Sequence, residues 1–552
     1  MMERLPFLWP EIILFIGTCL VMVIGLSRNL ALRKSCNFIC IISLIGAGIA
    51  AALYTPSIHD GHVVTAAMGQ TFLPNLPLFT KVLIAAVGVL LCLMLAGSVD
   101  RSEEVQIAQG KRAFDPLRTN RAEFYAFFLF SLTGLMLCAS ADDLIWLFLA
   151  LELTSLPTYI MVTLSTSANK SREAGVKYFF LGALGASIFL FGFAFLYGGT
   201  GSTNLNQIAE SFQHHGINAI AMAGILLSLV GLCFKIAAVP MHFYTADVYE
   251  GAAAPVTAML AFVPKTAGFI AILLICGAIG WSYAPTNSNA LEQVAGGTSL
   301  PEPIRVMLWV IAALTMTVGN VLALWQTSTK RMLAYSSIAH SGYMLVGIIV
   351  GPGTQKLSTS GISAILFYLM IYGIMNLAPM AVVATLEKKN AQGEDIEADS
   401  LDDLRGLWKS RPGLAAVMVI GALSLLGFPP LLGFFGKLPL FQAGISAGEI
   451  ALVIILGLNS AIAAYYYLRL VTLPFLSEPN ASAKPLTLNP FPARTLAGTI
   501  AAAAVIVLAF MGSTFAKSAE FAGFYKAKSQ NVDNHADAQP TENGIKIPER
   551  QE

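Results

Sequence analysis

Runs of about 20 apolar residues, separated by short polar segments, recur along the whole chain. A helix needs a run of that length to cross the hydrocarbon core of a bilayer, because each helical residue advances it by about 1.5 Å. The pattern therefore predicts an all-α polytopic membrane protein with about fourteen transmembrane helices. The predicted spans are 6–26, 36–55, 78–98, 122–140, 143–165, 174–198, 217–239, 252–278, 304–325, 330–350, 358–386, 413–444, 447–472 and 493–514.

Lysine and arginine gather in alternate loops between these spans. The loops after the odd-numbered helices carry most of them, whereas the loops after the sixth, eighth and tenth helices carry at most one each. Basic loops favour the cytoplasmic side of a membrane, so we expect both termini to lie outside. The first run is followed, not preceded, by Arg28, Arg33 and Lys34. We therefore interpret it as a retained helix and not as a signal peptide.

Two of the predicted helices contain breaks. The seventh is interrupted at Pro240, and the twelfth at Gly427-Phe428-Pro429-Pro430. Proline removes a backbone donor, and a membrane helix tolerates such a break only where protein or a wet cavity satisfies the freed groups. Helices five apart cross in opposite directions, so helices 4–8 and 9–13 are expected to be inverted repeats. The expected domains are 1–121 (three helices and a cytoplasmic loop), 122–278 (first repeat), 304–472 (second repeat), 493–514 (last helix) and 515–552 (polar tail).

Four ionisable residues lie deep within apolar runs: Glu152, Lys235, Lys265 and Lys437. Each costs at least ~2.5–3.5 kcal/mol to insert at the centre of a helix, which makes a functional role the favoured interpretation. Burial lowers the proton affinity of a lysine, and a nearby carboxylate raises it again. We therefore expect Glu152 and Lys235 to form a proton switch, with Lys265 and Lys437 continuing a relay.

Other titratable residues give a weaker signal. Lys177 follows Glu173 by four residues, which is the spacing of an ordinary surface pair on a helix. His242 and His340 can carry protons near neutral pH, although a buried histidine is as often only hydrogen-bonded. The remaining two are Glu11 and Lys81, which are expected to reach the headgroups from helix ends.

Composition narrows the class further. Hydrophobic residues make up 56% of the chain and charged residues 12%, and the net charge of +1 offers no basic field for nucleic acid. Its 7 cysteines form no CxxC pair, and no dinucleotide, phosphate-loop or metal motif is present in the sequence. We therefore expect no cofactor in this chain and expect the lipid bilayer to be its main environment.

Several long segments resemble a known family: LALELTSLPTYIMV, REAGVKYFFLGALGASIFLFG, FKIAAVPMHFYTADVYEGAAAPVTAMLAFVPKTAGF, KRMLAYSSIAHSGYML and GFPPLLGFFGKLPLF. They are similar to the antiporter-like membrane subunits of bacterial NADH:quinone oxidoreductase (respiratory complex I), from about helix 4 to helix 13. Within that family the FYTADVYEG stretch, the lysine of helix 12 and the short segment after helix 14 resemble subunit N. The polar tail and the long 3–4 and 11–12 loops exceed a minimal subunit N.

The resemblance implies roles for the buried residues. Glu152 and Lys235 match the glutamate and lysine of an input half-channel, Lys265 matches the lysine linking to the second half, and Lys437 matches the terminal lysine. Lys177 and His242 also match family positions. The resemblance further implies an inner-membrane location and partners such as subunits M, K and J. NADH, FMN, iron–sulfur clusters and quinone would be bound by other subunits.

Two alternatives remain open at the level of sequence. The first is a sodium/proton antiporter subunit of the Mrp type, which has no redox partner. The second is a membrane scaffold whose buried charges merely pair. A photosynthetic relative that takes electrons from ferredoxin is a further variant of the main interpretation.

Overall fold

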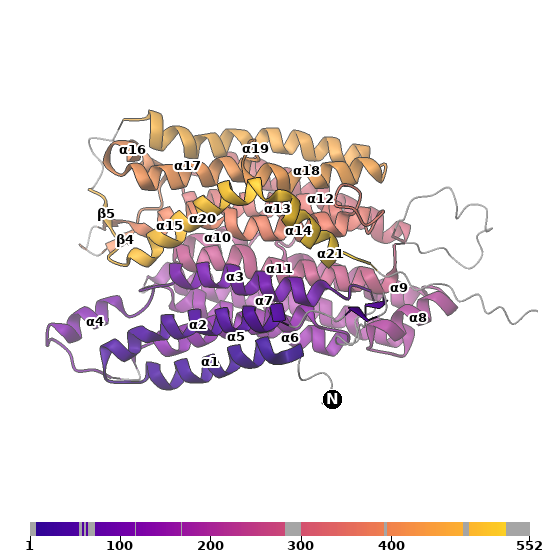
Figure 1. Cartoon of the computed structure of the whole chain (residues 1–552), viewed down its shortest axis with the longest axis horizontal. Helices are drawn as coiled ribbons and strands as arrows, with labels where there is room; N and C mark the ends of the chain where they lie inside the picture. The colour runs from indigo at the N-terminus through magenta and orange to yellow at the C-terminus, as the bar shows by residue number, and fades with distance from the viewer. Residues whose placement is uncertain are drawn as a thin grey trace, which may run out of the picture.

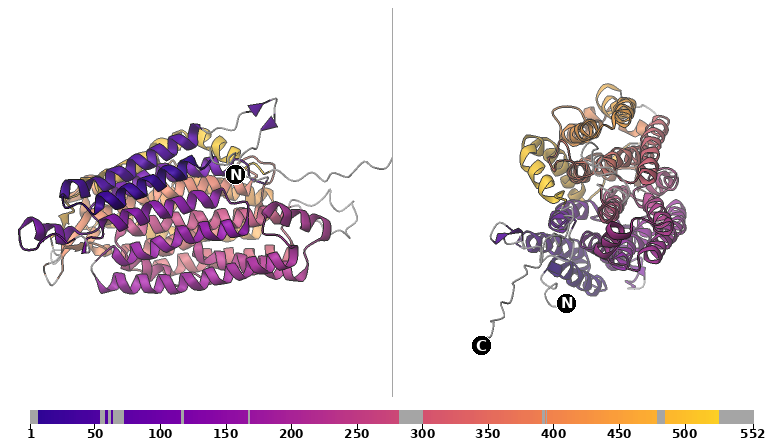
Figure 2. Two further views of the ribbon diagram at one scale, coloured as in Figure 1. Left: turned by 90° about the horizontal axis from the view of Figure 1, so that it is seen from below. Right: turned by 90° about the vertical axis from the view of Figure 1, so that its right-hand side faces the viewer.

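The computed structural model is a long bundle of roughly parallel helices (Figure 1). It describes residues 7–53, 58–59, 62–63, 72–115, 118–166, 168–281, 300–390, 393, 395–478 and 485–525. An end-on view shows the first helices on one side of the bundle and the helices up to Ile450–Leu476 on the other, with the C-terminal helix Pro492–Phe510 beside Leu76–Met94 (Figure 2). The bundle helices are α1 (Trp9–Gly25), α2 (Leu30–Leu53), α3 (Leu76–Met94), α5 (Arg121–Ala139), α6 (Leu144–Leu164), α7 (Asn169–Thr200), α9 (Ala219–Lys235), α10 (Thr245–Gly251), α11 (Ala254–Ile279), α12 (Glu302–Leu324), α13 (Thr329–Val350), α14 (Gly361–Met375), α15 (Leu377–Thr385), α17 (Pro412–Leu426), α18 (Leu432–Ser446), α19 (Ile450–Leu476) and α20 (Pro492–Phe510).

The described residues include 11 helices that are long and apolar enough to cross a membrane. Three shorter apolar helices, α1, α9 and α17, accompany them. Each predicted span overlaps one of the bundle helices or a consecutive pair of them. The chain is therefore a predominantly helical, polytopic membrane protein, as its apolar pattern indicates.

Both predicted helix breaks are present. α9 ends at Lys235 and α10 begins at Thr245, and α17 ends at Leu426 before α18 begins. Gly427 ends α17 with a φ of 86°, a left-handed conformation that glycine adopts without the steric cost of a Cβ.

A third break was not predicted, because the apolar run 358–386 is uninterrupted. The structure divides this run into α14 and α15. Pro379 lies in the first turn of α15, and its ring would clash with the carbonyl of Met375, the last residue of α14. The proline therefore accounts for the place at which the helix divides.

The core of the bundle lies around α11, α13 and α14. Every residue of α11 is buried, although its sequence would also suit a helix facing lipid. By contrast, α2 and α7 each expose a row of large apolar side chains on the outside of the bundle. A membrane protein exposes such faces to lipid, or to other membrane subunits, at little cost. The helices at the centre therefore form the protein interior in which buried charges can be held.

The expectation of an all-α fold needs a small correction, because short strands connect some of the helices. In the larger sheet, with the order β4-β3-β5, the chain after α15 pairs with itself and with the segment before α20. Backbone pairing satisfies donors in these connections that no helix satisfies. The elements outside the bundle are β1 (Ile58–His59), β2 (His62–Val63), α4 (Arg101–Ala108), α8 (Leu205–His215), β3 (Leu386–Lys389), β4 (Asp395–Glu397), η4 (Leu401–Leu404), α16 (Leu407–Ser410), β5 (Thr487–Leu488) and α21 (Gly512–Ala522).

The start of the predicted polar tail is helical and packs against the bundle. Asn75 donates a 2.9 Å hydrogen bond to the carbonyl of Phe521 in α21. Tyr525 lies edge-on to Trp281, with ring centroids 5.4 Å apart. The aromatic residues of this segment explain the docking, which the polar composition of the whole tail obscures. Residues 526–552 of the predicted tail lie outside the described residues.

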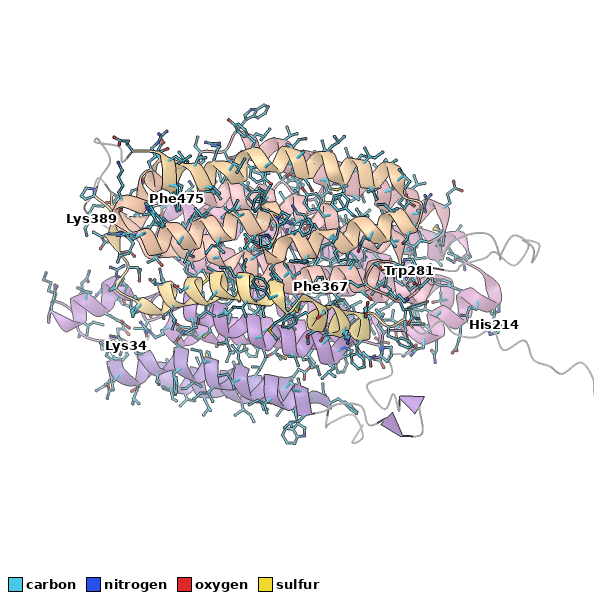
Figure 3. The ribbon with its side chains drawn as sticks, turned by 45° about the horizontal axis from the view of Figure 1, so that its top comes forward. Lys34, His214, Trp281, Phe367, Lys389 and Phe475 are labelled. Carbon is cyan, nitrogen blue, oxygen red and sulfur yellow. The ribbon has the colours of Figure 1, made fainter. Side chains whose placement is uncertain are left out.

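The two ends of the bundle differ in charge. Figure 3 shows Lys34 and Lys389 at one end, which we term the basic end, and His214 and Trp281 at the other. α9 begins at the end where α8 lies, whereas α17 begins at the basic end next to α16 (Figure 1). The two broken helices therefore run in opposite directions, as their spacing in the sequence predicts.

Candidate functional site

Glu152 of α6 and Lys235 of α9 form an ion pair inside the bundle. The Lys235 Nζ lies 3.0 Å from Oε1 of Glu152 and donates a 2.7 Å hydrogen bond to the Ser155 hydroxyl. The side chain of Lys235 is only 2% exposed and that of Glu152 is 17% exposed. The attraction between two charges is strong at such low exposure, because little water screens it. The pairing predicted from the sequence is therefore present.

The break that follows Lys235 is satisfied by neighbouring side chains. The amide of Val239 donates a 2.9 Å hydrogen bond to the Thr315 hydroxyl. The carbonyl of Ile236 accepts a 2.6 Å hydrogen bond from Ser341. These contacts replace the helical hydrogen bonds that the break removes, which an apolar bundle could not otherwise leave unmade. Both partner side chains come from the second half of the chain, so they hold the Lys235 terminus against that half.

Lys265 lies in the middle of α11, where it is buried on all sides. Its ammonium donates a hydrogen bond to the backbone carbonyl of Ser337 in α13. The nitrogen also lies 5.7 Å from the centre of the Tyr372 ring, a favourable distance for a cation and an aromatic face. No carboxylate in the described part of the chain forms an ion pair with Lys265. Its charged form thus depends on neutral groups alone.

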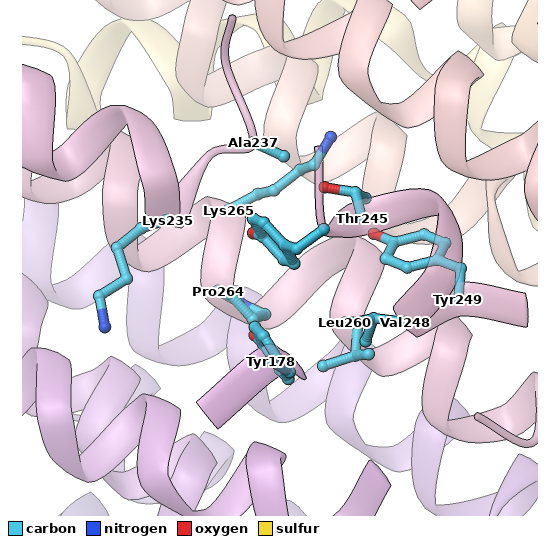
Figure 4. A pocket seen from close by; sticks show the side chains of 10 residues that line it. Tyr178, Lys235, Ala237, Thr245, Val248, Tyr249, Leu260, Pro264 and Lys265 are labelled. Atoms are coloured by element: carbon cyan, nitrogen blue, oxygen red, sulfur yellow. The ribbon is translucent and has the colours of Figure 1, made fainter. Parts of the chain in front are cut away.

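A small cavity of about 10 Å³ lies between Lys235 and Lys265. Its size is close to that needed for a single water molecule. Figure 4 shows the two lysine side chains bordering it and pointing away from each other. The buried hydroxyl of Thr245 lines the cavity and has no hydrogen-bond partner within the described part of the chain. A water molecule there would satisfy that hydroxyl and shorten the gap between the two lysines. Its other lining residues are Tyr178, Ala237, Tyr244, Val248, Tyr249, Leu260 and Pro264.

His340 of α13 is surrounded by tyrosine hydroxyl groups. Its Nδ1 lies 2.5 Å from the Tyr368 hydroxyl, and its Nε2 lies 2.8 Å from that of Tyr467. The Tyr467 hydroxyl is also hydrogen-bonded to Ser336. A histidine with a hydroxyl at each ring nitrogen can accept a proton on one side and release one on the other. This cluster connects α13, α14 and α19 in the second half of the chain.

Lys437 of α18 lies just beyond the second broken helix. Its ammonium donates a 2.7 Å hydrogen bond to the Leu426 carbonyl, which the break at Gly427 frees from helical bonding. The nitrogen lies 5.2 Å from the centre of the Tyr343 ring, which itself packs edge-on to His340. Lys437 is buried like Lys265 and has no ion-pair partner among the described carboxylates. The lysine at the second break is therefore held by a free backbone carbonyl, whereas Lys235 at the first break is held by a carboxylate.

Glu152, Lys235, Lys265, His340 and Lys437 form what we term the interior row. Two of the predicted residues lie apart from it. Lys177 is 44% exposed and pairs with Glu173 at 2.7 Å and with Asp247 at 3.3 Å. Asp247 in turn accepts from Arg331, which makes this a cluster at the surface. His242 lies half-buried in the segment between α9 and α10, where its Nδ1 has no partner among the described residues. Neither residue contacts Lys235 or Lys265 directly.

The expectation that Glu11 and Lys81 reach the headgroups is wrong. They form a 2.7 Å ion pair, with each side chain about 95% buried between α1 and α3. The Lys81 ammonium also donates a 2.7 Å hydrogen bond to the Phe7 carbonyl. A charge near a helix end can face inward when an opposite charge on a neighbouring helix meets it.

The sequence did not identify the hydroxyl groups that surround the lysines. Tyr372 donates a 2.8 Å hydrogen bond to the Ser337 hydroxyl, next to the carbonyl that Lys265 contacts. Tyr368 and Tyr372 are four residues apart, so they share a face of α14, and this spacing is the signal that could have revealed them. Ser155 could have been found similarly, since it lies three residues after Glu152.

The arrangement can move protons. Glu152, Lys235, Lys265, His340 and Lys437 are separated by hydroxyl groups and by a cavity of water size, and each can gain or lose a proton. Among the described residues, no group of three histidine, cysteine, aspartate or glutamate side chains is placed to hold a metal.

Comparison with known proteins identifies the family. A family model described as "NADH:quinone oxidoreductase/Mrp antiporter, TM" matches residues 141–463, which include the whole interior row. The NADH-quinone oxidoreductase subunit N of Trichlorobacter lovleyi is 37% identical over 471 residues, covering 85% of this chain and 87% of that protein. Subunit N 2 of Rhizobium meliloti is 32% identical over 515 residues, covering 93% and 97%.

Solved structures agree with this. A chain of respiratory complex I from Thermus thermophilus with bound aureothin has a TM-score of 0.70 at 28% identity, covering 92% of this chain and 98% of that one. A chain of the Mrp complex from Dietzia sp. has a TM-score of 0.69 at 20% identity, covering 95% and 97%. The latter similarity shows a shared fold alone and does not favour the Mrp alternative. The chain belongs to the family of NADH:quinone oxidoreductase and Mrp-type antiporter membrane subunits and, within it, to the subunit N group.

Proposed function

We propose that this chain is a proton-translocating membrane subunit of an NADH:quinone oxidoreductase, driven by quinone reduction elsewhere in the complex. The observation that carries the proposal is the buried Glu152–Lys235 ion pair at a helix break, followed by two buried lysines that have no acidic partner among the described residues. Burying three lysines and a glutamate in an apolar bundle costs free energy, and such charges mark functional sites in membrane proteins. The redox partner is inferred from the relatives, which are named as subunit N of NADH-quinone oxidoreductase.

The proton path begins with Glu152 and Lys235. A charge change in a neighbouring subunit draws Glu152 away, and the buried ammonium of Lys235 then loses its main stabilisation. Its proton passes through the cavity near Thr245 to the neutral amine of Lys265. It continues past His340 and its tyrosines to Lys437, which releases it outside. Lys235 then takes up a proton from the cytoplasm as Glu152 returns. We assign Lys177 and His242 to the entry side of this path.

We further propose fourteen membrane crossings, with inverted repeats over 122–278 and 304–472. Residues 1–121, 493–514 and 515–552 flank them as the N-terminal helices, the last helix and the tail. The opposite directions of α9 and α17 support the repeats, as does the lysine beside each break (Figure 1). In such a pair of half-channels, one opens to each side of the membrane.

The basic end lies in the cytoplasm and both termini lie in the periplasm of a bacterial inner membrane. The gathering of Lys34 and Lys389 at one end supports this orientation, because basic residues favour the cytoplasmic side (Figure 3). Subunits M, K and J are the proposed neighbours. NADH, FMN, the iron–sulfur clusters and the quinone are bound by other subunits, and this chain contributes no redox centre.

Proton uptake by inside-out membrane vesicles tests the proposal. Vesicles carrying Lys265→Ala should assemble the complex on a native gel yet lose at least ten-fold in NADH-driven, quinone-dependent proton uptake. Lys34→Ala removes an exposed lysine at the basic end and should leave uptake unchanged. Uptake by assembled Lys265→Ala complex at the Lys34→Ala rate would contradict a relay through Lys265 and favour a scaffold.

A further inference from the structure

Another buried ion pair lies at the basic end, where α11 and α13 begin side by side. Glu397, the last residue of β4, accepts hydrogen bonds of 2.9 and 3.0 Å from the amide of Ala254, the first residue of α11. It also lies 3.1 Å from the Nζ of Lys330, in the first turn of α13. Lys330 donates a 2.8 Å hydrogen bond to the carbonyl of Ala252, just before α11. One carboxylate and one ammonium thus join the beginnings of both helices.

Asp399 completes the joint on the side of α13. Its carboxylate accepts a 2.8 Å hydrogen bond from the Lys330 amide and a 2.5 Å hydrogen bond from the Ser328 hydroxyl. Its backbone carbonyl accepts a 2.7 Å hydrogen bond from the amide of Thr329. Burial raises the pKa of the Asp399 carboxyl, and the adjacent Lys330 ammonium opposes that rise. We term Glu397, Asp399 and Lys330 the N-terminal clamp.

The charges of the N-terminal clamp are balanced by the helices that it joins. Each helix N-terminus carries a partial positive charge from its unpaired amides, and the Lys330 ammonium adds one full charge. Two carboxylates offset these three positive groups. Neutralising Glu397 or Lys330 alone therefore leaves a net charge at the joint, whereas neutralising both does not.

The joined helices carry two groups of the proposed relay. Lys265 lies eleven residues after Ala254 along α11, which corresponds to about 16 Å of helix. Ser337, whose carbonyl holds the Lys265 ammonium, lies seven residues after Lys330 along α13. Both helices begin at the same end, so the clamp sets how far one is shifted along the other. That shift determines whether Lys265 meets the Ser337 carbonyl.

We propose that Glu397 is a positioning residue that fixes α11 against α13 and balances the Lys330 charge, thereby setting the ease with which Lys265 accepts a proton. This inference rests on the proposed function, since it concerns a residue of the relay. Nothing in the sequence indicated it, because Glu397 lies in a polar strand of three residues that is too short to show alternation.

Other charged groups that face the clamp stay unchanged in the test. Glu250 of α10 faces Lys330 and is itself paired with Lys170 and Arg331. Arg494 of α20 faces Glu397, as does Glu387, which lies opposite it across the β3–β4 pairing. These groups remain in every variant below, so differences between variants report on Glu397 and Lys330.

The test measures the pH dependence of proton uptake in inside-out vesicles containing Glu397→Gln, Lys330→Met or both changes. Glu397→Gln leaves Lys330 unbalanced, so protonation of Lys265 becomes harder. Half-maximal uptake should shift to lower pH by about 0.5–1 unit, as expected for one charge about 16 Å away at an effective dielectric constant of about 20. Lys330→Met should shift it to higher pH, and the double variant should return it to the original value. Asp402→Asn, in the nearby η4 and exposed, should cause no shift.

Shifts in the same direction for both single variants, or no shift in either, would overturn the proposal. If neither single variant assembles on a native gel, Glu397→Asp decides, because it keeps the charge but withdraws it by one methylene. It should lower proton uptake per NADH at an unchanged pH midpoint, and unaltered uptake would contradict the positioning role. Lys235→Ala in the same vesicles separates the two hypotheses, because normal uptake there removes the proposed function whatever the clamp variants do.

Discussion

The three interior lysines are held by different kinds of partner, and the difference gives the row a direction. Lys235 has a carboxylate and a hydroxyl, whereas among the described residues Lys265 and Lys437 have a backbone carbonyl and an aromatic face but no carboxylate. A carboxylate stabilises an ammonium far more than a neutral dipole does in a dry interior. In the proposed proton path, the proton therefore rests on Lys235 while Glu152 is close and moves onward when Glu152 retreats.

The four buried charges were recognisable in the sequence because each interrupts a long apolar run. The sequence also indicated Glu152 as the partner of Lys235, and the two form an ion pair. The partners of the other two lysines were not predicted, because both are backbone carbonyls, those of Ser337 and Leu426, which only the folded bundle brings to Lys265 and Lys437. The inward-facing positions of these charges could thus be predicted, whereas most of the groups that hold them could not.

Ser155→Ala tests how finely Lys235 is adjusted. The serine hydroxyl accepts a 2.7 Å hydrogen bond from the ammonium, so it favours the charged lysine. A hydrogen bond to a charged group contributes about 1.5–3 kcal/mol. Its loss removes one of the groups that hold the Lys235 ammonium, and NADH-driven proton uptake should fall several-fold. Ser187→Ala, on an exposed turn of α7, serves as the control. Uptake at the wild-type rate would show that Ser155 does not act on Lys235.

Among the helices, proline and glycine mark where a helix ends. Side chains of neighbouring helices then determine how many of the freed backbone groups stay hydrogen-bonded. The breaks near Pro240 and Gly427 were evident from sequence, and the division before α15 was not, although Pro379 was in view. An uninterrupted apolar run gave no reason to divide that helix. The small sheet after α15 was also missed, because its strands are too short to show alternation.

The Thr315 hydroxyl should contribute to stability through the break after α9. Thr315→Val keeps the side-chain volume but leaves the buried amide of Val239 without an acceptor. An unsatisfied buried donor costs about 1–3 kcal/mol, so the thermal unfolding midpoint of the purified complex should fall. Thr499→Val, exposed on α20, should leave the midpoint unchanged. Equal midpoints for the two variants would mean that another group accepts from Val239.

At the scale of the whole molecule, the N-terminal helices are joined to one another by a charge pair of their own. Glu11 and Lys81 lie outside the segment that the family model matches, and their pair connects α1 to α3. The positions of the helices along the chain were predictable from apolar runs because helices in lipid must satisfy their own backbone. How the helices pack was not, since long-range contacts such as this pair leave no local pattern.

Lys81→Met should therefore destabilise the N-terminal helices. Removing one partner leaves the Glu11 carboxylate buried and unpaired, which typically costs 3–5 kcal/mol. Less assembled complex should be recovered on a native gel. Adding Glu11→Gln removes the uncompensated charge and should restore most of the assembly. If Lys81→Met alone assembled normally, the pair would have no structural importance.

The proposed switch of the proton path is Lys235. Its role can be measured as NADH-driven, quinone-dependent proton uptake by inside-out vesicles carrying Lys235→Ala, with assembly checked on a native gel. We expect an assembled complex with little oxidoreductase activity and little proton uptake, because electron transfer cannot proceed when its coupled proton path is blocked. An assembled complex that retains both activities would contradict the switch and leave Lys235 a structural charge.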